Sequence, residues 1–385
     1  KIFITWGDND FAANVCHLVL ARLPDGGPGT RGISLFLVPK FIPDAQGNPG
    51  RRNAVQVVSL EHKLGLHGSP TCVMQYDGAT GWLVGEPHKG MAAMFTMMNN
   101  ARQGVGVQGV AVAEAAWQQA LAFAQERRQG RTPVEGGSGA IAEHPDVRRM
   151  LAEMKAEVVA ARAIALMCAV AIDMGRATGD PAWQARAALL TPIAKAFGTE
   201  TGIRVADLGV QVHGGMGYVE ETGAAQFLRD VRVTAIYEGT NGIQAMDLVG
   251  RKLLRDGGAA AQELFADLDA EIARAAPELA DLAAAARRGL EQARRGVALL
   301  LAGAGPDPHL PGSIAFPLLM LLATTVAGSL LLRAARLSLA PGQGPAAQAR
   351  VQVARFFFAQ IAPRNGAWLE TIAGGSAAIM APADV

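Results

Sequence analysis

The chain has 385 residues, of which 50% are hydrophobic and 18% charged, so it can bury a large core and is expected to form two or three domains. The formal net charge of +1 gives no reason to expect a nucleic acid or a strongly acidic partner. Cys16, Cys72 and Cys168 lie far apart and form neither a disulfide framework nor a zinc motif, which fits a cytoplasmic protein.

The first part of the chain, to about Glu86, has the pattern of an antiparallel β domain or part of one. Residues 1–5 are expected to belong to a strand already under way. Further short apolar runs alternate with turns rich in Pro, Gly and Asp: "HLVLARL", "GISLFLVPKF", "NAVQVVSLE" and "TCVMQYDGATGWLVGE".

Long helices are expected from Met91 onward. One runs through Arg128, and a second begins at Pro145 after a Gly-rich loop and stops near Gly175. Asp180 and Pro181 are typical of the start of a third helix, which runs towards residue 211 and ends at residues 214–215. A fourth long helix is expected just after Glu238, so the pattern predicts a four-helix bundle.

Beyond Arg255 the sequence becomes rich in Ala and Arg and predicts an additional helical domain. Residues 314–332 lack charges over about the length that crosses a bilayer, although Pro317 and Gly328 interrupt them. A buried helix and a membrane-contacting helix are both compatible with this segment. The expected fold is α+β and mostly α, with a partial β domain at 1–90, the bundle at 91–254 and the extra helical domain at 255–385.

Glu238 is the most informative carboxylate, because it lies between Tyr237 and a Gly-Thr-Asn-Gly turn with apolar sequence on both sides. A poorly hydrated carboxylate accepts a proton readily and suits a general base. Gly239 leaves room for a ligand, and Thr240 is a good N-cap for a helix that begins near Asn241. The alternative is a helix cap with a solvated glutamate, and the residues alone leave both open.

Two other segments carry weaker signals. Residues 211–218, "QVHGGMGY", can bring backbone N–H groups close to a phosphate, or form a helix C-cap and a tight turn. The cations of "FAQERRQGR" either complement a helix dipole or clamp a diphosphate. His144, Asp207 and His213 show no metal-ligand spacing, and no GxSxG motif occurs, so the sequence favours neither a metal site nor a serine hydrolase.

Six blocks in order make residues 1–253 resemble the acyl-CoA dehydrogenase family: "KIFITWG", "KLGLHGSPTCVMQYDGATGWLVGE", "GMAAMFTMMNNARQGVGVQG", "FAQERRQG", "QVHGGMGYVEE" and "LRDVRVTAIYEGTNGIQ". The region after Arg255, together with "HGSPTCVM", looks most like the subgroup that includes 3-(methylthio)propanoyl-CoA dehydrogenase. The resemblance implies a flavin enzyme built from an N-terminal helical domain, a β domain and a four-helix bundle.

The family's chemistry, carried over to this chain, assigns Glu238 as the base that removes the α-proton of an acyl-CoA. The β-hydrogen leaves as hydride to FAD, and a trans-2-enoyl-CoA forms. The backbone N–H of the base helps to hold the thioester oxygen. Electrons then pass to an electron-transfer flavoprotein. An acyl-CoA oxidase, another flavoprotein of the same fold and a non-catalytic, membrane-associated scaffold are the alternatives.

The resemblance also implies ligand contacts, and it implies a homo-oligomer (dimer or tetramer) because two subunits contribute to each FAD. Residues that correspond to FAD contacts are Phe3, Ile4, Thr5, Arg127, Gln129, His144, Gln211, Val212, His213, Gly214, Gly215, Thr240, Asn241 and Gly242. Those that correspond to substrate contacts are Asn99, Arg102 and Gly239.

The chain departs from the family pattern in several places. Phe3 stands where many members have Trp, "RRQGR" lacks a usual Phe, and Pro145 replaces a usual Gln. The N-terminal helical domain and a Thr-Glu-Pro loop of the β domain are not found in these residues. The chain by itself is therefore not expected to provide a complete flavin site.

Overall fold

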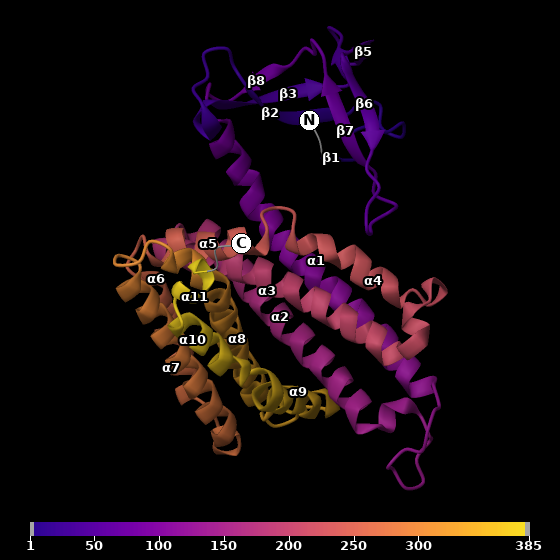
Figure 1. Ribbon diagram of the computed structural model, residues 1–385, viewed down its shortest axis with the longest axis vertical. Helices are drawn as coiled ribbons and strands as arrows, with labels where there is room; N and C mark the ends of the chain where they lie inside the picture. The colour runs from indigo at the N-terminus through magenta and orange to yellow at the C-terminus, as the bar shows by residue number, and fades with distance from the viewer. Residues whose placement is uncertain (1–3, 382–385) are drawn as a thin grey trace. The chain divides into compact units, whose positions relative to one another are not determined.

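The computed structural model describes residues 4–381, and the chain divides into two compact units, residues 1–101 and 102–385 (Figure 1). The first unit contains the strands, and the second is helical. The expected mostly α fold with a small antiparallel β region is confirmed.

The strands of the first unit form small antiparallel sheets. β7 lies between β1 and β6, β3 lies between β2 and β8, and β4 pairs with β5. Their alternating apolar residues meet in a core made by Val38, Val55, Cys72 and Met74. The bounds are β1 (Ile4–Thr5), β2 (Cys16–Arg22), β3 (Ile33–Pro39), β4 (Phe41–Pro43), β5 (Pro49–Arg52), β6 (Val55–Leu60), β7 (Thr71–Tyr76) and β8 (Trp82–Val84).

The first three helices begin and end close to the predicted residues. α1 (Gly90–Glu126) continues from the first unit into the second, and α2 (Pro145–Thr178) and α3 (Pro181–His213) follow. The Asp180 carboxylate accepts a hydrogen bond from the backbone N–H of Ala182 at 2.8 Å, which caps α3. Gly179 and Gly214 have φ of +68° and +59°, the left-handed φ values that favour glycine after a helix.

The fourth helix differs from its prediction. The long helix expected after Glu238 is α5 (Asn241–Asp247) of seven residues, which continues as a π-helical segment over Leu248–Leu253. A short helix, α4 (Ala224–Val231), precedes it and was not predicted. α4 has eight residues, which are too few to show a helical periodicity in the sequence. A single π-helical turn has no residue types of its own, so the sequence does not distinguish it from an α-helix.

The C-terminal helices share a core with α2 and α3. In this part of the chain α8 packs against α7, α9 and α10 and also against α2 and α3 (Figure 1). One apolar cluster runs from Ile164 and Leu190 to Leu264 and Leu322. The helices are α6 (Ala259–Ala273), α7 (Ala280–Gly303), α8 (Leu310–Ser338), α9 (Pro345–Phe356), α10 (Arg364–Ala373) and α11 (Ala377–Met380).

Two described helices, α2 and α8, are long and apolar enough to cross a membrane by length and composition. In α8, which contains residues 314–332, 78% of the apolar window is buried inside the protein, against 44% in α2. Burial of this kind is what a core helix shows, so the structure agrees with the buried-helix interpretation of residues 314–332.

α1 and α3 cross at glycines that let their backbones touch. A Cβ on Gly106 would lie 2.8 Å from the carbonyl oxygen of Ala194, and one on Gly198 would lie 2.5 Å from that of Gly106. Gly109 faces Gly198 and Gly202 in the same way. Because the obstructing atoms are backbone, no rotamer change can relieve such a clash.

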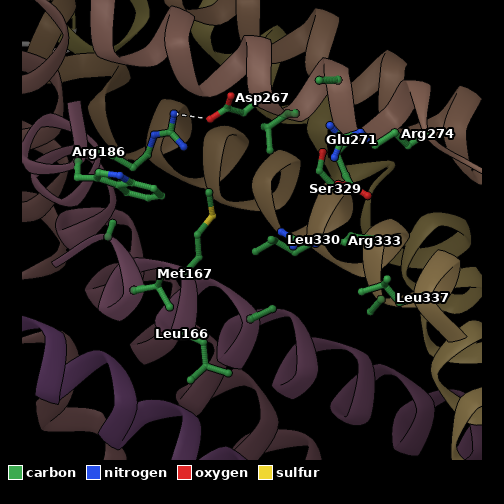
Figure 2. A pocket seen from close by; sticks show the side chains of 17 residues that line it. Leu166, Met167, Arg186, Asp267, Glu271, Arg274, Ser329, Leu330, Arg333 and Leu337 are labelled. Carbon is green, nitrogen blue, oxygen red and sulfur yellow. Dashed lines mark hydrogen bonds and ion pairs between the residues drawn. The ribbon is translucent and has the colours of Figure 1, made fainter. Parts of the chain in front are cut away.

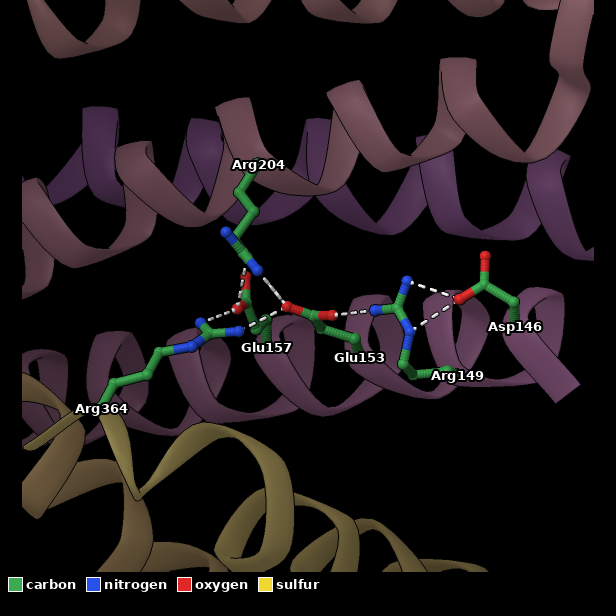
Figure 3. A network of polar contacts seen from close by, with 6 residues as sticks. All are labelled: Asp146, Arg149, Glu153, Glu157, Arg204 and Arg364. Carbon is green, nitrogen blue, oxygen red and sulfur yellow. Dashed lines mark hydrogen bonds and ion pairs between the residues drawn. The ribbon is translucent and has the colours of Figure 1, made fainter.

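Charged side chains link α10 to the bundle (Figure 3). The Arg364 guanidinium contacts Glu157 at 2.6 Å and also Glu153, both on α2. Arg204 of α3 contacts the same two carboxylates, at 3.0 Å for Glu157, and Arg149 contacts Glu153 at 3.0 Å. The network therefore joins three helices through two buried acids.

The two acids respond differently to this environment. Burial tends to raise the pKa of Glu153, but the hydrogen bonds and charges of Arg204 and Arg364 outweigh burial and lower it. For Glu157, which is more deeply buried, burial outweighs the same arginines and raises the pKa. Both arginines therefore favour the charged form of Glu157 without outweighing its burial.

We expect Gly198→Ala to destabilise the fold by about 3 kcal/mol or more, because its methyl group would meet backbone atoms of α1. Gly104→Ala on α1 is the matched control: a Cβ there meets nothing within 4 Å, so it should stabilise by up to about 1 kcal/mol. Urea unfolding measures both. Equal effects of the two substitutions would contradict the close crossing.

Arg364→Leu should destabilise the fold by about 2 kcal/mol at pH 8, because it leaves buried carboxylates with one counter-charge fewer. The pKa of Glu157 is already raised in the folded protein, so protonation of this carboxyl favours the folded state. The loss of stability caused by Arg364→Leu should therefore shrink as the pH falls to 5. Arg355→Leu, which removes an exposed pair with Asp281, should cost less and show no such trend. Thermal unfolding of both variants at pH 8 and pH 5 measures these losses of stability.

Candidate active site

The loop that carries Glu238 has an unusual backbone. It joins the 3₁₀ turn Arg232–Ala235 to α5, and Glu238 and Gly239 have φ of +55° and +87°. A left-handed conformation at a non-glycine residue costs of order 1–3 kcal/mol, and such residues cluster at active sites and ligand-binding loops. As predicted, Thr240 caps α5, because its hydroxyl oxygen accepts from the backbone N–H of Ile243 at 3.2 Å.

Gln244 holds this loop from inside. Its side-chain amide, which is fully buried, donates to the carbonyl oxygens of Gly239 at 3.1 Å and Glu238 at 3.4 Å. A Cβ on Gly239 would lie 2.8 Å from that amide nitrogen, so glycine is required by space as well as by φ. The Glu238 side chain is half-buried, and its carboxylate makes no hydrogen bond or ion pair with residues 4–381.

Arg102 lies inside the protein beneath Gly239. It is 4% exposed, and its guanidinium pairs with Asp247 at 3.1 Å; Asp247 also contacts Arg251 at 2.6 Å. The Nε of Arg102 and the Oε1 of Gln244 are buried without a partner in the described part of the chain. Buried polar atoms normally have partners, so these two are expected to meet water or a ligand. The substrate contact predicted for Arg102 stays a prediction.

Sequence reasoning missed Lys195, which is completely buried on α3. Its ammonium donates to the side-chain oxygen of Asn241 at 2.9 Å. The Asn241 amide in turn donates to Glu200 at 2.8 Å and to Thr199 at 3.0 Å. The available signal was a lone lysine within the apolar run "LLTPIAKAF", where each neighbouring residue is buried.

Asn241 and Tyr237 both point their polar groups into the protein. The side chain of Asn241 is 5% exposed, so its predicted contact with FAD could be made only by its backbone, whereas Thr240 and Gly242 are exposed. Burial raises the pKa of the Tyr237 phenol, a hydrogen bond to Gln108 lowers it, and the charge of Glu238 raises it further. The phenol therefore stays neutral and donates to Gln108.

Three predicted FAD residues meet where α1 ends and α2 begins. The His144 imidazole donates through Nε2 to the backbone carbonyl of Gln129 at 2.9 Å, and Arg127 donates to the Gln129 side chain at 3.4 Å. An isolated antiparallel bridge between Arg128 and Ala140 shapes this corner. Arg127 and Gln129 are exposed, and His144 is half-buried.

The predicted loop at residues 211–215 is in part the last turn of α3. Val212 and His213 are buried. The His213 ring donates through Nδ1 to the carbonyl of Gly209 at 2.7 Å and stacks on Phe123 with 4.4 Å between ring centroids. Gln211, Gly214 and Gly215 are exposed. The stacking places this turn beside the last turns of α1, at the same end of the bundle as Arg127.

The remaining predicted residues lie in the first unit. Ile4 and Thr5 form β1 and pair with Cys72 and Thr71 of β7. Phe3 lies outside the described residues. Asn99 belongs to α1, and its side chain is likewise outside the described part.

A cavity of about 640 Å³ opens between α2, α3, α6 and α8, away from the residues discussed so far (Figure 2). Its walls are largely apolar and include Leu166, Met167, Leu330 and Leu337, and an ion pair between Arg186 and Asp267 closes one side at 2.7 Å. None of the predicted site residues lines it.

Two family models match this chain. One, described as acyl-CoA dehydrogenase, C-terminal domain, matches residues 88–254, and a second, described as acetyl-CoA dehydrogenase C-terminal like, matches residues 264–382. The first match contains α1 to α5 and the Glu238 loop, and the second covers the C-terminal helices.

Similar proteins agree with these matches. A 3-methylmercaptopropionyl-CoA dehydrogenase of Ruegeria pomeroyi is 46% identical over 381 residues, which are 94% of this chain and 63% of that protein. The crystal structure of Caenorhabditis elegans ACDH-11 in complex with C11-CoA matches with a TM-score of 0.76 and 24% identity, covering 96% of this chain and 61% of that one.

An acyl-CoA dehydrogenase from Bacillus anthracis complexed with FAD gives a TM-score of 0.78 at 22% identity, covering 97% of this chain and 63% of that one. At these identities the two structures establish the fold alone, and the chain spans less than two thirds of each of the three proteins. The chain belongs to the acyl-CoA dehydrogenase family.

Proposed function

We propose that the protein containing this chain catalyses the FAD-dependent α,β-dehydrogenation of an acyl-CoA thioester to a trans-2-enoyl-CoA. The observation that carries the proposal is the Glu238 carboxylate, which is half-buried, has no partner among the described residues and lies on a strained loop beside an obligatory glycine. Such a group is held ready to bind a proton rather than to stabilise the fold.

Glu238 would take the α-proton of the acyl group. The Cβ direction of Gly239 faces Gln244, so the missing side chain lets the loop lie close against the protein interior. The thioester is proposed to approach this loop from its opposite side. Removal of the α-proton requires that charge on the thioester oxygen be stabilised, and the backbone N–H of Glu238 is the proposed donor. The proton passes to the carboxylate while the β-hydrogen leaves with its electron pair, so the carbon skeleton loses two hydrogens.

The residues present fit a bound FAD in two places. Thr240 and Gly242 offer exposed groups at the loop that carries the base, and Gly214 and Gly215 form an exposed turn at the other end of the bundle. When bound, FAD supplies the redox chemistry by accepting the β-hydrogen as hydride. The orphaned Nε of Arg102 and Oε1 of Gln244 lie just behind the first of these places.

The spacing of these residues favours a flavin shared between subunits. Glu126 lies 24 residues after Arg102 along α1, a rise of about 36 Å, because an α-helix rises 1.5 Å per residue. Glu238 lies over the first of these positions, and Arg127, Gln129 and His144 follow the last. One dinucleotide does not span that length, so both groups can serve FAD only if a second copy of the protein contributes one of them.

The acyl-CoA substrate is supported by the names of the relatives, including the methylmercaptopropionyl-CoA dehydrogenase and the complex with C11-CoA. Electrons would pass from the reduced flavin to an electron-transfer flavoprotein. We further propose a homo-oligomer in the cytoplasm, in keeping with a shared flavin and three unpaired cysteines.

The native-length protein should purify yellow and lose its colour when a saturated acyl-CoA is added without air. The absorbance of the flavin near its visible maximum measures this, with a free fatty acid as the control ligand. A protein that remains colourless with added FAD would overturn the proposal. Oxygen consumption during turnover would instead identify an oxidase.

Glu238→Gln should bind FAD and acyl-CoA as the unaltered protein does and turn over about 10²–10⁴-fold more slowly, because the amide cannot take a proton. Glu221→Gln is the control, since Glu221 is an exposed glutamate outside the loop that carries Glu238. The measurement is kcat/KM with one acyl-CoA. Near-normal turnover by Glu238→Gln would exclude Glu238 as the base.

A further inference from the structure

Gln244 is a fully buried amide whose hydrogen bonds go to the backbone of the loop that carries Glu238. Its side-chain nitrogen donates to the carbonyl oxygen of Gly239 at 3.1 Å and to that of Glu238 at 3.4 Å. Among the described residues, these are the hydrogen bonds that the two oxygens accept. One amide therefore holds two successive carbonyls on the inner side of the loop, with one hydrogen for each.

Gln244 itself has little freedom to move. It lies in α5, and its backbone N–H donates to the carbonyl oxygen of Thr240 at 2.9 Å. Asp247, three positions further along the same helix, pairs with the buried Arg102 of α1 at 3.1 Å. A Cβ on Gly239 would lie 2.8 Å from the Gln244 amide nitrogen, so the loop rests directly on this side chain. The amide is therefore a fixed support for the loop.

The two bonds determine which way the neighbouring peptide groups face. The described peptide bonds are trans, so each backbone N–H points opposite to the carbonyl of the preceding residue. With both carbonyls directed inward, the N–H groups of Gly239 and Thr240 face the outer side of the loop, where they have no acceptor among the described residues. At Glu238, a fixed carbonyl together with a φ of +55° also fixes the Cα–Cβ bond, which carries the carboxylate.

The backbone of Glu238 needs such a support. A left-handed φ is unfavourable at Glu238, which has a side chain, and costs little at Gly239. The net free energy of two hydrogen bonds is of the same order as that cost. The Thr240 hydroxyl, which accepts from the N–H of Ile243 at 3.2 Å, holds the turn after the loop and not the peptide groups on either side of Gly239. Loss of the two Gln244 bonds would therefore let Glu238 leave the left-handed region.

We propose that Gln244 is a positioning residue for the proposed base: its amide holds the left-handed backbone of Glu238 and so fixes the direction of the carboxylate. The proposal rests on the proposed function, because it takes Glu238 as the base. Gln244 is buried beneath the loop, and it acts on Glu238 through the two carbonyls rather than by contact with substrate or flavin. Both acceptors are carbonyl oxygens, so the amide nitrogen and not Oε1 must face them.

The test compares Gln244→Met with Gln244→Glu in the native-length protein with FAD bound. Methionine has a similar length and no donor, whereas glutamate keeps the length and the polarity but sets carboxylate oxygens against two carbonyl oxygens. Gln119→Met is the matched control. Gln119 of α1 is a half-buried glutamine whose amide also donates to a loop carbonyl, that of Thr222, outside the loop that carries Glu238. Steady-state kinetics with one saturated acyl-CoA give kcat and KM separately.

We expect kcat to fall about 10²-fold in both Gln244 variants with KM nearly unchanged, because a displaced base weakens an interaction that is made in the transition state. The kinetic isotope effect of an α-deuterated acyl-CoA should increase, since removal of the α-proton becomes slower relative to the other steps. Gln119→Met should leave kcat, KM and the isotope effect in place. A lowered Tm with normal kcat, or a rise in KM alone, in either Gln244 variant would overturn the proposal.

A crystal structure of either Gln244 variant provides a readout that does not depend on turnover. The φ of Glu238 should be negative in the variant, and its carbonyl should no longer face the side chain at position 244. A backbone that keeps its φ near +55° would overturn the inference and leave the proposed function intact. Normal turnover by Glu238→Gln, by contrast, would overturn the proposed function itself, so the two failures are distinguishable.

Discussion

The site depends on the contact between the backbones of α1 and α3. Gly106 and Gly109 on one helix meet Gly198 and Gly202 on the other, and each lacks the Cβ that would separate the two axes. Because the helices approach so closely, Arg102 from α1 lies against Gly239, and Lys195 from α3 reaches Asn241 at the start of α5. A pair of helices at an ordinary separation would leave a gap there or fill it with apolar side chains.

Local sequence chemistry predicted much of the framework. Asp180 and Pro181 start α3, Gly214 ends it, and Thr240 caps α5, because each of these residues acts on its own turn of backbone. The strand runs of the first unit were equally visible, since alternation and turn residues are local signals. The boundaries between the predicted domains remain predictions, and in the second unit the apolar core continues from α2 and α3 into the C-terminal helices without a break.

The parts that sequence did not predict depend on contacts between distant residues. The substrate contact of Arg102 stays a prediction, but its burial was not visible in the sequence, because its partner Asp247 is 145 positions away. Asn241 has the residue type of a helix start and a phosphate contact, yet its side chain turns inward to Lys195 and Glu200. Arg364 meets Glu153 across 211 positions. Residue type alone does not determine which face of a helix becomes buried.

The loop geometry explains why a carboxylate occupies a position at which core packing would favour leucine. The left-handed backbone at Glu238 is unfavourable in itself and persists only because the surrounding contacts fix it. Gln244 binds the carbonyls on both sides of Gly239, and Thr240 anchors the next turn. These contacts use backbone groups and leave the Glu238 side chain free of partners. A leucine here would keep the strain and gain little burial, since the position is half-exposed. The strain is therefore compatible with a chemical role for this side chain and has no evident purpose in packing.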